Sequence, residues 1–290
     1  MYEGMVIRPP SEARSLILQI TLGCSHNRCT FCGTYNDKKF RIKGLEEVFA
    51  DIEEAVPEVR GYTKRVFLAD GDAMMLPTDH LVKILDKLQQ EMPELGRVGI
   101  YANARDILGK TEEELKLLES KKLGIIYLGL ESGDDEVLKS VKKGATAQEM
   151  TDAVIKAQEC GIKASVIALL GLGGRGEGGR RHAEATGKVA SRMNPRFFSC
   201  LTLMVLENTP IGRAYERGEF ELITPEESLK ELRIIIENLD VKNTIFRANH
   251  ASNYLPIGGT LPRDRQKVLD AIDACLRGDT GMRPEFLRGL

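Results

Sequence analysis

Short runs of apolar residues alternate, along the first two thirds of the chain, with segments in which apolar residues recur every three to four positions. The runs have the length of buried strands, and the periodic segments have the spacing of one helix face. Continuous apolar strands separated by helices are typical of a parallel sheet covered on both faces, so we predict an α/β fold. The expected strands span residues 16–21, 65–69, 98–102, 124–130, 164–170 and 197–205.

Two of the helices between these strands begin at a capping box. Thr111 and Glu114 form one Thr-x-x-Glu pair, and Thr146 and Glu149 form the other. Each pair satisfies two backbone N–H groups at a helix start. Because crossovers between parallel strands are right-handed, six such β/α units predict a partial (β/α)6 TIM-like barrel. We expect this core to span residues 1–210.

The pattern changes after the core. Residues 249–256 are polar and irregular, and the apolar runs become shorter. The expected elements are a helix from Thr224 and Pro225, a strand over 241–247 and a helix over 263–276. We therefore predict that residues 211–290 form a C-terminal α-rich extension that packs on the barrel.

Length and charge narrow the class of protein. The chain has 290 residues, 42% of them hydrophobic, which is enough for one large domain or a domain with an extension. The net charge of −2 gives no basic footprint for nucleic acid, and no apolar run is long enough to cross a bilayer. Since no export signal is recognisable, we expect a cytoplasmic protein with reduced cysteines.

The candidate chemistry lies in one loop after the first expected strand. It holds Cys24, Cys29 and Cys32, and thiolates are soft ligands that favour iron–sulfur clusters and zinc. Zinc is the main alternative, with His26 as the fourth ligand, although structural zinc sites often use two paired knuckles. A disulfide is a weaker alternative in a long chain without an export signal, and a thioredoxin-like pair leaves Cys24 unexplained. The isolated cysteines are expected in the core: Cys160, Cys200 and Cys275.

The loop resembles the cysteine motif of the radical S-adenosylmethionine (radical SAM) superfamily, whose usual pattern is C-x3-C-x-aromatic-C. Phe31 stands between Cys29 and Cys32, while the first gap has four residues instead of three. The resemblance implies a 4Fe-4S cluster held by the three cysteines, with one iron left for S-adenosylmethionine (SAM). It further implies that the reduced cluster cleaves SAM to a 5′-deoxyadenosyl radical, which abstracts hydrogen from a substrate.

The resemblance also implies cofactor-binding residues at the expected strand ends. Asp70, Gly71 and Asp72 are similar to the family's Gly-Gly-Glu segment, whose backbone and acid bind the methionine amino group. Glu131, followed by Ser132, matches the acid that binds the ribose hydroxyls in methylthiotransferases and oxygen-independent coproporphyrinogen oxidases. A carboxylate suits two vicinal hydroxyls because it accepts two hydrogen bonds. The remaining candidates are Phe31, Asn103, Arg105, Gly171 and Leu203.

Each of these candidates has a structural alternative. Asp72 would otherwise belong to an ordinary strand-end turn, and Glu131 to a salt bridge. Arg105 is suited to hold the methionine carboxylate through two hydrogen bonds, or else is a surface arginine. Gly171 begins a glycine-rich segment similar to the family's adenine-side segment, or else a flexible loop.

The polar segment near the C-terminus is the expected substrate side of the site. His250 and Tyr254 are the candidate catalytic residues, because both side chains can transfer protons, and an exposed polar loop is the alternative. A basic run either recognises an anionic substrate group or is a solvated helix start: Arg175, Arg180, Arg181 and His182.

These patterns favour a radical SAM enzyme that acts on a small molecule rather than a macromolecule. The expected partners are this unidentified substrate and an electron donor such as flavodoxin or ferredoxin, without nucleic acid or membrane. An iron–sulfur electron-transfer or sensor protein without SAM chemistry is the alternative, and a structural zinc protein is a third possibility. No second cysteine group indicates an auxiliary cluster, and neither an RNA-binding extension nor a cobalamin-binding domain is recognisable.

Overall fold

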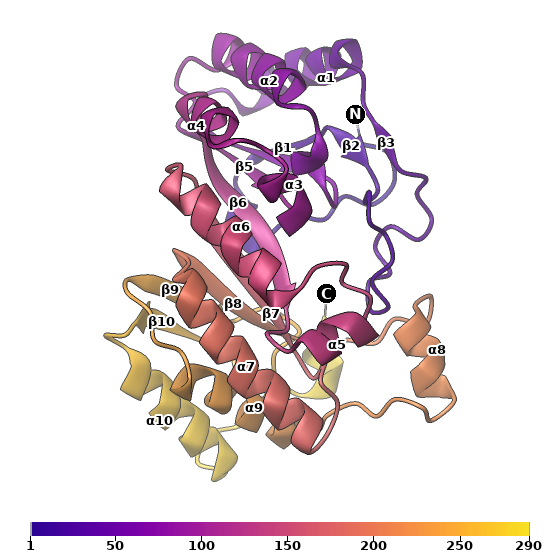
Figure 1. Ribbon diagram of the computed structural model, residues 1–290, viewed down its shortest axis with the longest axis vertical. Coiled ribbons are helices and arrows are strands. Elements are labelled where there is room, and N and C mark those ends of the chain that lie inside the picture. The colour runs from indigo at the N-terminus through magenta and orange to yellow at the C-terminus, as the bar shows by residue number, and fades with distance from the viewer. Residues whose placement is uncertain (1, 290) are drawn as a thin grey trace. The chain divides into compact units, whose positions relative to one another are not determined.

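Eight strands form the main sheet in a computed structural model that describes residues 2–289 (Figure 1). Their bounds are β1 (Leu16–Gln19), β4 (Arg65–Ala69), β5 (Arg97–Tyr101), β6 (Leu123–Glu131), β7 (Lys163–Leu170), β8 (Phe197–Thr202), β9 (Thr244–Ala248) and β10 (Ile257–Leu261), and this is also their order in the sheet. The pairs β1–β4, β4–β5, β5–β6, β7–β8 and β8–β9 are parallel, and β9–β10 is antiparallel. The predicted α/β class with a mostly parallel sheet is confirmed.

Helices separate most of these strands. They are α1 (Leu45–Val59), α2 (Thr78–Glu91), α3 (Ala104–Leu108), α4 (Glu112–Ser120), α5 (Asp135–Ser140), α6 (Ala147–Glu159), α7 (Glu177–Met193), α8 (Pro210–Glu216), α9 (Pro225–Glu237) and α10 (Arg265–Leu276). Short 3-10 turns lie at Pro10–Glu12, Ala73–Met75 and Glu285–Leu287. The capping box at Thr111 is present, with both reciprocal hydrogen bonds. Thr146 and Glu149 make the same two contacts at the start of α6.

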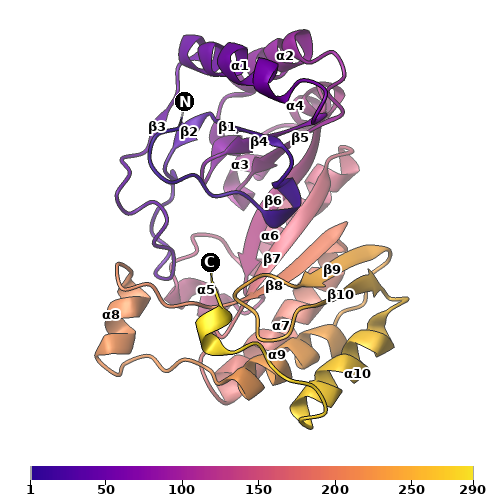
Figure 2. The ribbon, with the colours of Figure 1, turned by 180° about the vertical axis from the view of Figure 1, so that it is seen from behind.

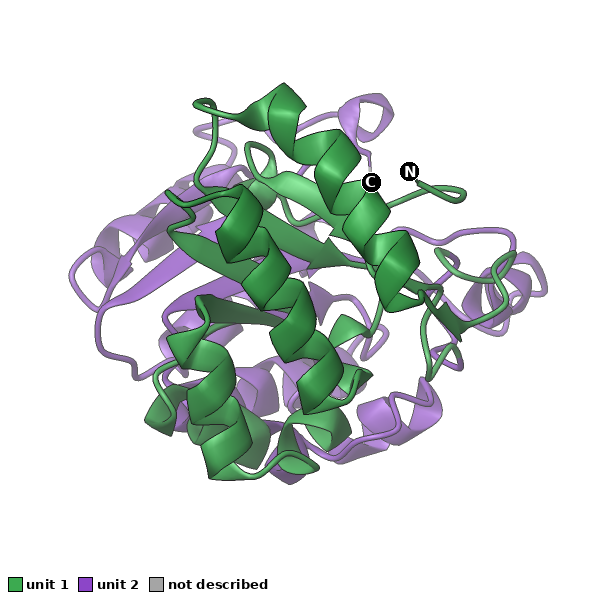
Figure 3. Cartoon of the chain, turned by 90° about the horizontal axis from the view of Figure 1, so that it is seen from above, with its two compact units in different colours: residues 1–27, 34–128, 152–164 green, residues 28–33, 129–151, 165–290 purple. Residues whose placement is uncertain are grey.

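The chain divides into two compact units, coloured separately in Figure 3. Unit 1 comprises Met1–Asn27, Thr34–Leu128 and Asp152–Ala164, and unit 2 comprises Arg28–Gly33, Gly129–Thr151 and Ser165–Leu290. Each unit is described here by itself. The expected boundary between a core and an extension at residue 210 is not tested by this division and stays a prediction.

In unit 1 the apolar stripes of two helices supply much of the core. The apolar stripe of α2 is buried, with Leu81, Ile84, Leu85 and Leu88 at 0% exposure. Helix α1 lies beside α2 and also contacts β1 (Figure 1). Transfer of one such leucine from water contributes about 1.5–3 kcal/mol to folding, so the spacing of these residues fixes the face that each helix buries.

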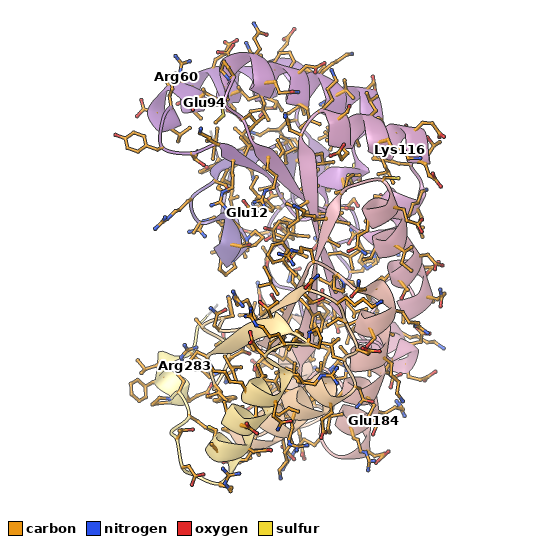
Figure 4. All side chains as sticks on the ribbon, turned by 90° about the vertical axis from the view of Figure 1, so that its left-hand side faces the viewer. Glu12, Arg60, Glu94, Lys116, Glu184 and Arg283 are labelled. Carbon is orange, nitrogen blue, oxygen red and sulfur yellow. The ribbon has the colours of Figure 1, made fainter. Side chains whose placement is uncertain are left out.

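A buried acid ties the segment before β1 to the sheet of unit 1. Glu12, labelled in Figure 4, has no exposed surface. Its carboxylate accepts hydrogen bonds from Arg97 at the start of β5 and from the Tyr127 hydroxyl on β6. Because an unpaired buried charge is costly, both donors are needed to keep Glu12 inside.

In unit 2 the helices α7, α9 and α10 lie in sequence, α7 against α9 and α9 against α10 (Figures 1 and 2). The expected helices near 225–237 and 263–276 are present. The predicted α-rich extension also supplies β9 and β10 to the sheet. We did not predict β10, because its sequence Ile-Gly-Gly-Thr-Leu has two glycines, which are unfavourable inside a strand.

Other differences concern short elements. The expected strand 16–21 ends at Gln19, and β2 (Thr21–Leu22) pairs instead with β3 (Arg41–Ile42) in a separate antiparallel sheet. The expected strand 197–205 ends at Thr202. Helices α3, α5 and α8 were not predicted, because none exceeds seven residues and two turns are too short for a clear period.

The capping box at the start of α9 gives a first prediction. Thr224 accepts a hydrogen bond from the N–H of Glu227, whose carboxylate accepts one from the N–H of Thr224. Thr224→Ala should lower the free energy of unfolding by about 1 kcal/mol, because one backbone donor loses its partner. Urea denaturation measures this change. Lys230→Ala, on the exposed part of α9, is the control, and an equal loss in both variants would contradict the prediction.

Candidate cofactor-binding site

Asp70 anchors the loop that carries Cys24. It follows β4 and is fully buried. Its Oδ2 accepts hydrogen bonds from Gln19 Nε2 at 2.9 Å and from the backbone N–H of Gly23 at 3.0 Å, and Lys38 Nζ lies 3.2 Å away. These donors compensate a carboxylate that has left water. Asp70 therefore fixes the residue before Cys24 to the end of β4.

Gly71 allows the loop and the strand end to approach closely. Its N–H donates to the carbonyl oxygen of Gly23 at 3.2 Å. A Cβ atom at position 71 would lie 2.8 Å from the Cβ of Cys24 and 2.5 Å from the ring of Tyr35. Both distances are too short for ordinary van der Waals contact. The absence of a side chain is thus required at this position.

Asp72 binds two side chains through one of its oxygens. It is fully buried, and Oδ2 accepts hydrogen bonds from the Ser25 hydroxyl and, at 3.1 Å, from Arg105 Nη2. Arg105 also donates to Ser25. Oδ1 of Asp72 is buried and has no hydrogen-bond partner among the described residues. Such orphaned acceptors are rare in proteins, and this one is suited to a cationic ligand group.

Asp106 adds a second acid to this group. Its pKa is raised to about 7, chiefly by burial and also by the Asp72 carboxyl group, while Arg105 opposes the shift. Within residues 2–289, Oδ2 of Asp106 and Nδ2 of Asn103 are also buried without a hydrogen-bond partner. Arg105 and Asp106 line a pocket of about 460 Å³ in unit 1. The ends of β4 and β5 thus carry several polar atoms with unused hydrogen-bonding capacity.

The second part of the cysteine loop is held within unit 2. The N–H of Cys32 donates to the carbonyl oxygen of Cys29 at 3.2 Å. Between them, Thr30 donates from its N–H to the carbonyl oxygen of Val141 and accepts from the N–H of Ile211, both at 3.0 Å. The end of α5 and the start of α8 therefore position the turn that carries these two cysteines.

Phe31 packs partly buried against an apolar cluster of unit 2. The cluster consists of Val137, Val141, Leu172, Leu203 and Ile211. The predicted adenine-side residue Leu203 thus belongs to the same cluster as Leu172, which follows Gly171. Gly171 has φ = 86°, a conformation that favours glycine.

Glu131 ends β6 in a strained conformation. Its φ is 62°, which is uncommon for a residue with a side chain. Its Oε1 lies 2.9 Å from Lys143 Nζ, and the two side chains are only 13% and 11% exposed. The salt-bridge alternative is therefore present in the structure, and the ribose role of Glu131 stays a prediction.

None of the six cysteines forms a disulfide within the described chain. Cys24, Cys29 and Cys32 are partly exposed, whereas Cys160, Cys200 and Cys275 are buried as predicted. Burial raises the pKa of the Cys200 thiol. Cys24 belongs to unit 1, and Cys29 and Cys32 belong to unit 2. No three His, Cys, Asp or Glu side chains of residues 2–289 are grouped so that they could hold a metal ion, so the convergence of the three thiols stays a prediction.

The predicted catalytic residues have structural contacts within unit 2. The Tyr254 hydroxyl donates to Glu285 at 2.8 Å and accepts from Arg288, whose guanidinium lies 4.1 Å from the centre of the tyrosine ring. Burial, together with the hydrogen bond to Glu285, raises the pKa of Tyr254 to about 12. Burial and the charge of Arg283, labelled in Figure 4, lower the pKa of His250. These contacts do not test a catalytic role.

The basic run does not form one patch. Arg175 pairs with Glu227, Arg180 with Glu184, and Arg181 with Asp134. His182 is instead fully buried. The three arginines that would recognise an anionic substrate group are therefore already paired with carboxylates of the protein.

Several neighbours of the predicted residues were not identified from the sequence. They are Ser25, Lys38, Asp106 and Lys143. Asp106 directly follows Arg105, so its place beside a predicted site residue was a usable signal, although it lies within α3. The others lie on loops, and no local pattern relates a loop serine or lysine to an acid on a distant strand.

Comparison with known proteins identifies the class. Residues 18–184, more than half of the chain, match the radical SAM superfamily. The chain therefore belongs to this superfamily, whose members use a 4Fe-4S cluster and SAM for radical chemistry. Both predicted cofactors are confirmed at this level, and the protein is an enzyme of unspecified subclass.

Two relatives and one solved structure are similar to this chain. A Methanocaldococcus jannaschii protein named as a candidate methylthiotransferase is 28% identical over 149 residues, covering 49% of this chain and 32% of that protein. The heme chaperone HemW of Bacillus subtilis is 20% identical over 226 residues, covering 75% and 58%. The structure of coproporphyrinogen III oxidase (HemN) from Escherichia coli, a radical SAM enzyme, has a TM-score of 0.57 at 17% identity and covers 78% of this chain and 53% of that one.

The structural similarity and the sequence similarities support different conclusions. The structural likeness concerns the fold alone and agrees with the predicted TIM-like barrel. The chain spans about a third to three fifths of the length of the two curated relatives. In the part of the chain that the structure describes, no helix combines the length and the apolar character that a membrane crossing requires.

The side chains present fit the cofactors of the family. Three thiols outside any disulfide lie in one loop, and thiolates are the usual ligands of iron–sulfur clusters. Asp72 offers a buried oxygen with spare capacity beside an arginine that is 51% exposed on its side chain. An acid and a guanidinium are the groups that suit the ammonium and carboxylate of an amino acid.

The raised pKa of Asp106 gives a second prediction. An aspartate of the unfolded chain titrates near pH 4, whereas Asp106 in the folded protein titrates at about 7. Folding thus favours the protonated form of Asp106. The contribution of this group to the free energy of unfolding is fully present below about pH 4 and is lost as the pH rises through about 7. Asp106→Asn should remove this loss, which is on the order of 1–3 kcal/mol.

Thermal unfolding from pH 4 to pH 8 measures the effect. The stability of the wild-type protein should fall relative to that of Asp106→Asn as the pH rises. Asp79→Asn, at a side chain that is 75% exposed on α2, should follow the wild-type profile. Parallel profiles for the wild type and Asp106→Asn would contradict the prediction.

Proposed function

We propose that this chain uses Cys24, Cys29 and Cys32 to hold a 4Fe-4S cluster and binds SAM to begin hydrogen abstraction from a small-molecule substrate. The observation that carries the proposal is the Asp70–Asp72 turn. It holds the Cys24 loop through Asp70 and Gly71, and the next residue presents a buried carboxylate oxygen without a partner in residues 2–289. The loop that carries the proposed cluster ligand Cys24 and the acid proposed to bind SAM, Asp72, thus belong to one hydrogen-bonded structure.

In unit 1 the assigned role is recognition of the methionine part of SAM. Oδ1 of Asp72 would accept from the ammonium group, since this buried atom is otherwise unsatisfied among the described residues. Arg105 would hold the carboxylate through its guanidinium fork. Asn103, with a buried amide nitrogen that has spare capacity, would donate a further hydrogen bond.

In unit 2 the assigned role is recognition of the adenosine part. Glu131 would bind the ribose hydroxyls, because a carboxylate accepts from two vicinal donors. Gly171 and Leu203 would offer backbone groups to the adenine, and Phe31 would add apolar contact. Lys143 pairs with Glu131 and would hold its carboxylate in place.

The bound cofactors would supply one-electron cleavage of SAM and hydrogen abstraction from an unactivated carbon. The protein's own residues bind and orient these groups and exclude water from them. His250 or Tyr254 would transfer a proton on the substrate side. The pocket beside Arg105 and Asp106 admits small molecules, which supports a small-molecule substrate, and flavodoxin or ferredoxin would supply the electron.

Cluster assembly and SAM cleavage give the third prediction. Protein reconstituted with iron and sulfide without oxygen and reduced with dithionite should form 5′-deoxyadenosine from SAM. Cys29→Ala should lose both the visible cluster absorption and this product, because one iron loses its thiolate. Cys160→Ala, at a buried cysteine outside the loop, should retain both.

Two results would contradict the proposal. A fully assembled cluster that yields no 5′-deoxyadenosine would favour the electron-transfer or sensor alternative. About one zinc per chain without sulfide would favour the structural zinc site.

The two acids give the fourth prediction. Asp72→Asn and Glu131→Gln preserve side-chain size but remove the charge. Each should leave iron and sulfide content unchanged and weaken SAM binding about tenfold or more, because hydrogen bonds to a charged group contribute about 1.5–3 kcal/mol. Equilibrium dialysis of the reconstituted protein measures the affinity. Asp240→Asn, at an exposed position outside the pocket beside Arg105 and Asp106, is the matched control, and wild-type affinity in either acid variant would remove its assignment.

A further inference from the structure

Three polar side chains from separate elements form a chain of contacts in the interior of unit 2. They are Ser132 after β6, His182 on α7 and Glu231 on α9, with exposures of 0%, 0% and 5%. Nδ1 of His182 lies 2.7 Å from the Ser132 hydroxyl, and Nε2 lies 2.9 Å from Oε1 of Glu231. The contact between Nε2 and Oε1 has the distance of a hydrogen bond but not its angle. Buried polar side chains usually have polar partners, so this buried cluster requires an explanation.

The order serine, histidine, acid is that of a nucleophilic triad, but the structure excludes that role. Ser132 has no exposed surface, so a substrate cannot reach its oxygen. The same oxygen accepts the N–H of Asp134 at 3.0 Å, and its O–H is assigned to Nδ1 of His182. Because the hydroxyl both donates and accepts a hydrogen bond within the protein, Ser132 holds its neighbours in place.

Both ends of the chain of contacts reach segments assigned to the cofactor. Ser132 follows Glu131, the proposed ribose acid. At the other end, Oε1 of Glu231 accepts the N–H of Gly171 at 2.9 Å, and Gly171 begins the glycine-rich loop after β7. A proton on Nε2 of His182 would suit both contacts, since Nδ1 then accepts from Ser132 and the N–H of Nε2 faces the carboxylate.

Helix α7 makes further contacts with the segment after β6. The N–H of Gly133 donates to the Thr186 hydroxyl at 2.9 Å, and Arg181 pairs with Asp134. A Cβ atom at Gly133 would lie 2.4 Å from the carbonyl oxygen of Ala185, so the two segments touch through backbone. Thus α7 clamps the residues that follow Glu131, and His182 lies at the centre of these contacts.

We infer that His182 is a positioning residue that, with Glu231, holds the end of β6 and the N–H of Gly171 in the mutual geometry that binds adenosine. The inference rests on the proposed function, because it takes Glu131 and Gly171 as adenosine-binding positions. It adds two residues, His182 and Glu231, that touch no cofactor. Their loss should affect recognition of the adenosine part of SAM and leave recognition of its methionine part unchanged.

The test uses two variants that each preserve one contact of the imidazole. His182→Asn places a polar atom near the position of Nδ1, and His182→Gln places one near the position of Nε2. The full-length reconstituted protein is titrated, without oxygen, with S-adenosylhomocysteine and with L-methionine. Each variant should bind S-adenosylhomocysteine about tenfold more weakly, with methionine affinity, iron and sulfide content unchanged. Glu184→Gln, on the same helix and paired with Arg180 (Figure 4), is the control.

The outcomes separate this inference from the proposed function. Wild-type S-adenosylhomocysteine affinity in a folded, fully reconstituted His182 variant overturns the inference, and so does an equal loss for both ligands, which would reflect general damage. If neither variant folds, Ser132→Ala, which removes one oxygen, is judged by the same two affinities. A wild-type protein that assembles its cluster but binds no S-adenosylhomocysteine overturns the proposed function and the inference together.

Discussion

The buried carboxylate of Asp70 is the constraint on which the cysteine loop depends. A charge without exposed surface must be compensated inside the protein, and Asp70 recruits Gln19, the Gly23 N–H and Lys38 for this purpose. Since these donors come from β1 and from both sides of Cys24 in the sequence, one acid joins the strand end to the loop. The close approach at Gly71 follows from this attachment, and so does the position of Asp72 beside Ser25.

The same part of unit 1 keeps unsatisfied polar atoms at a cost to stability. Each buried acceptor without a partner costs about 1–3 kcal/mol, and Asp70, Asp72 and Asp106 each have one such oxygen among the described residues. A ligand that binds only the folded chain returns this free energy as binding. In unit 2 the acid proposed for the ribose, Glu131, instead pairs through Oε1 with Lys143. The proposed site thus contains acids with an unpaired oxygen in unit 1 and an ion-paired acid in unit 2.

Much of the fold could be predicted because its signals are local. The capping boxes at Thr111 and Thr146 and the helix start at Thr224 depend on residues a few positions apart, and the structure confirms them. The strand β10 gave no such signal, because it is stabilised by pairing with β9 and not by its own composition. In the site, Asp72 and Glu131 stand at strand ends and were identified by motif. Lys143 and Ser25 were not, because their partners are set by tertiary structure.

The basic run on α7 shows why residue type alone predicted the wrong environment for His182. Successive residues of a helix point about 100° apart, so adjacent positions need not share an environment. Arg180 and Arg181 reach acids at the surface, with side chains 65% and 57% exposed, while His182 turns into the core. In the sequence these residues were grouped only because all of their side chains are basic. Because its compact ring carries a nitrogen on either side, His182 is the one member of the run that contacts both Ser132 and Glu231 from the interior.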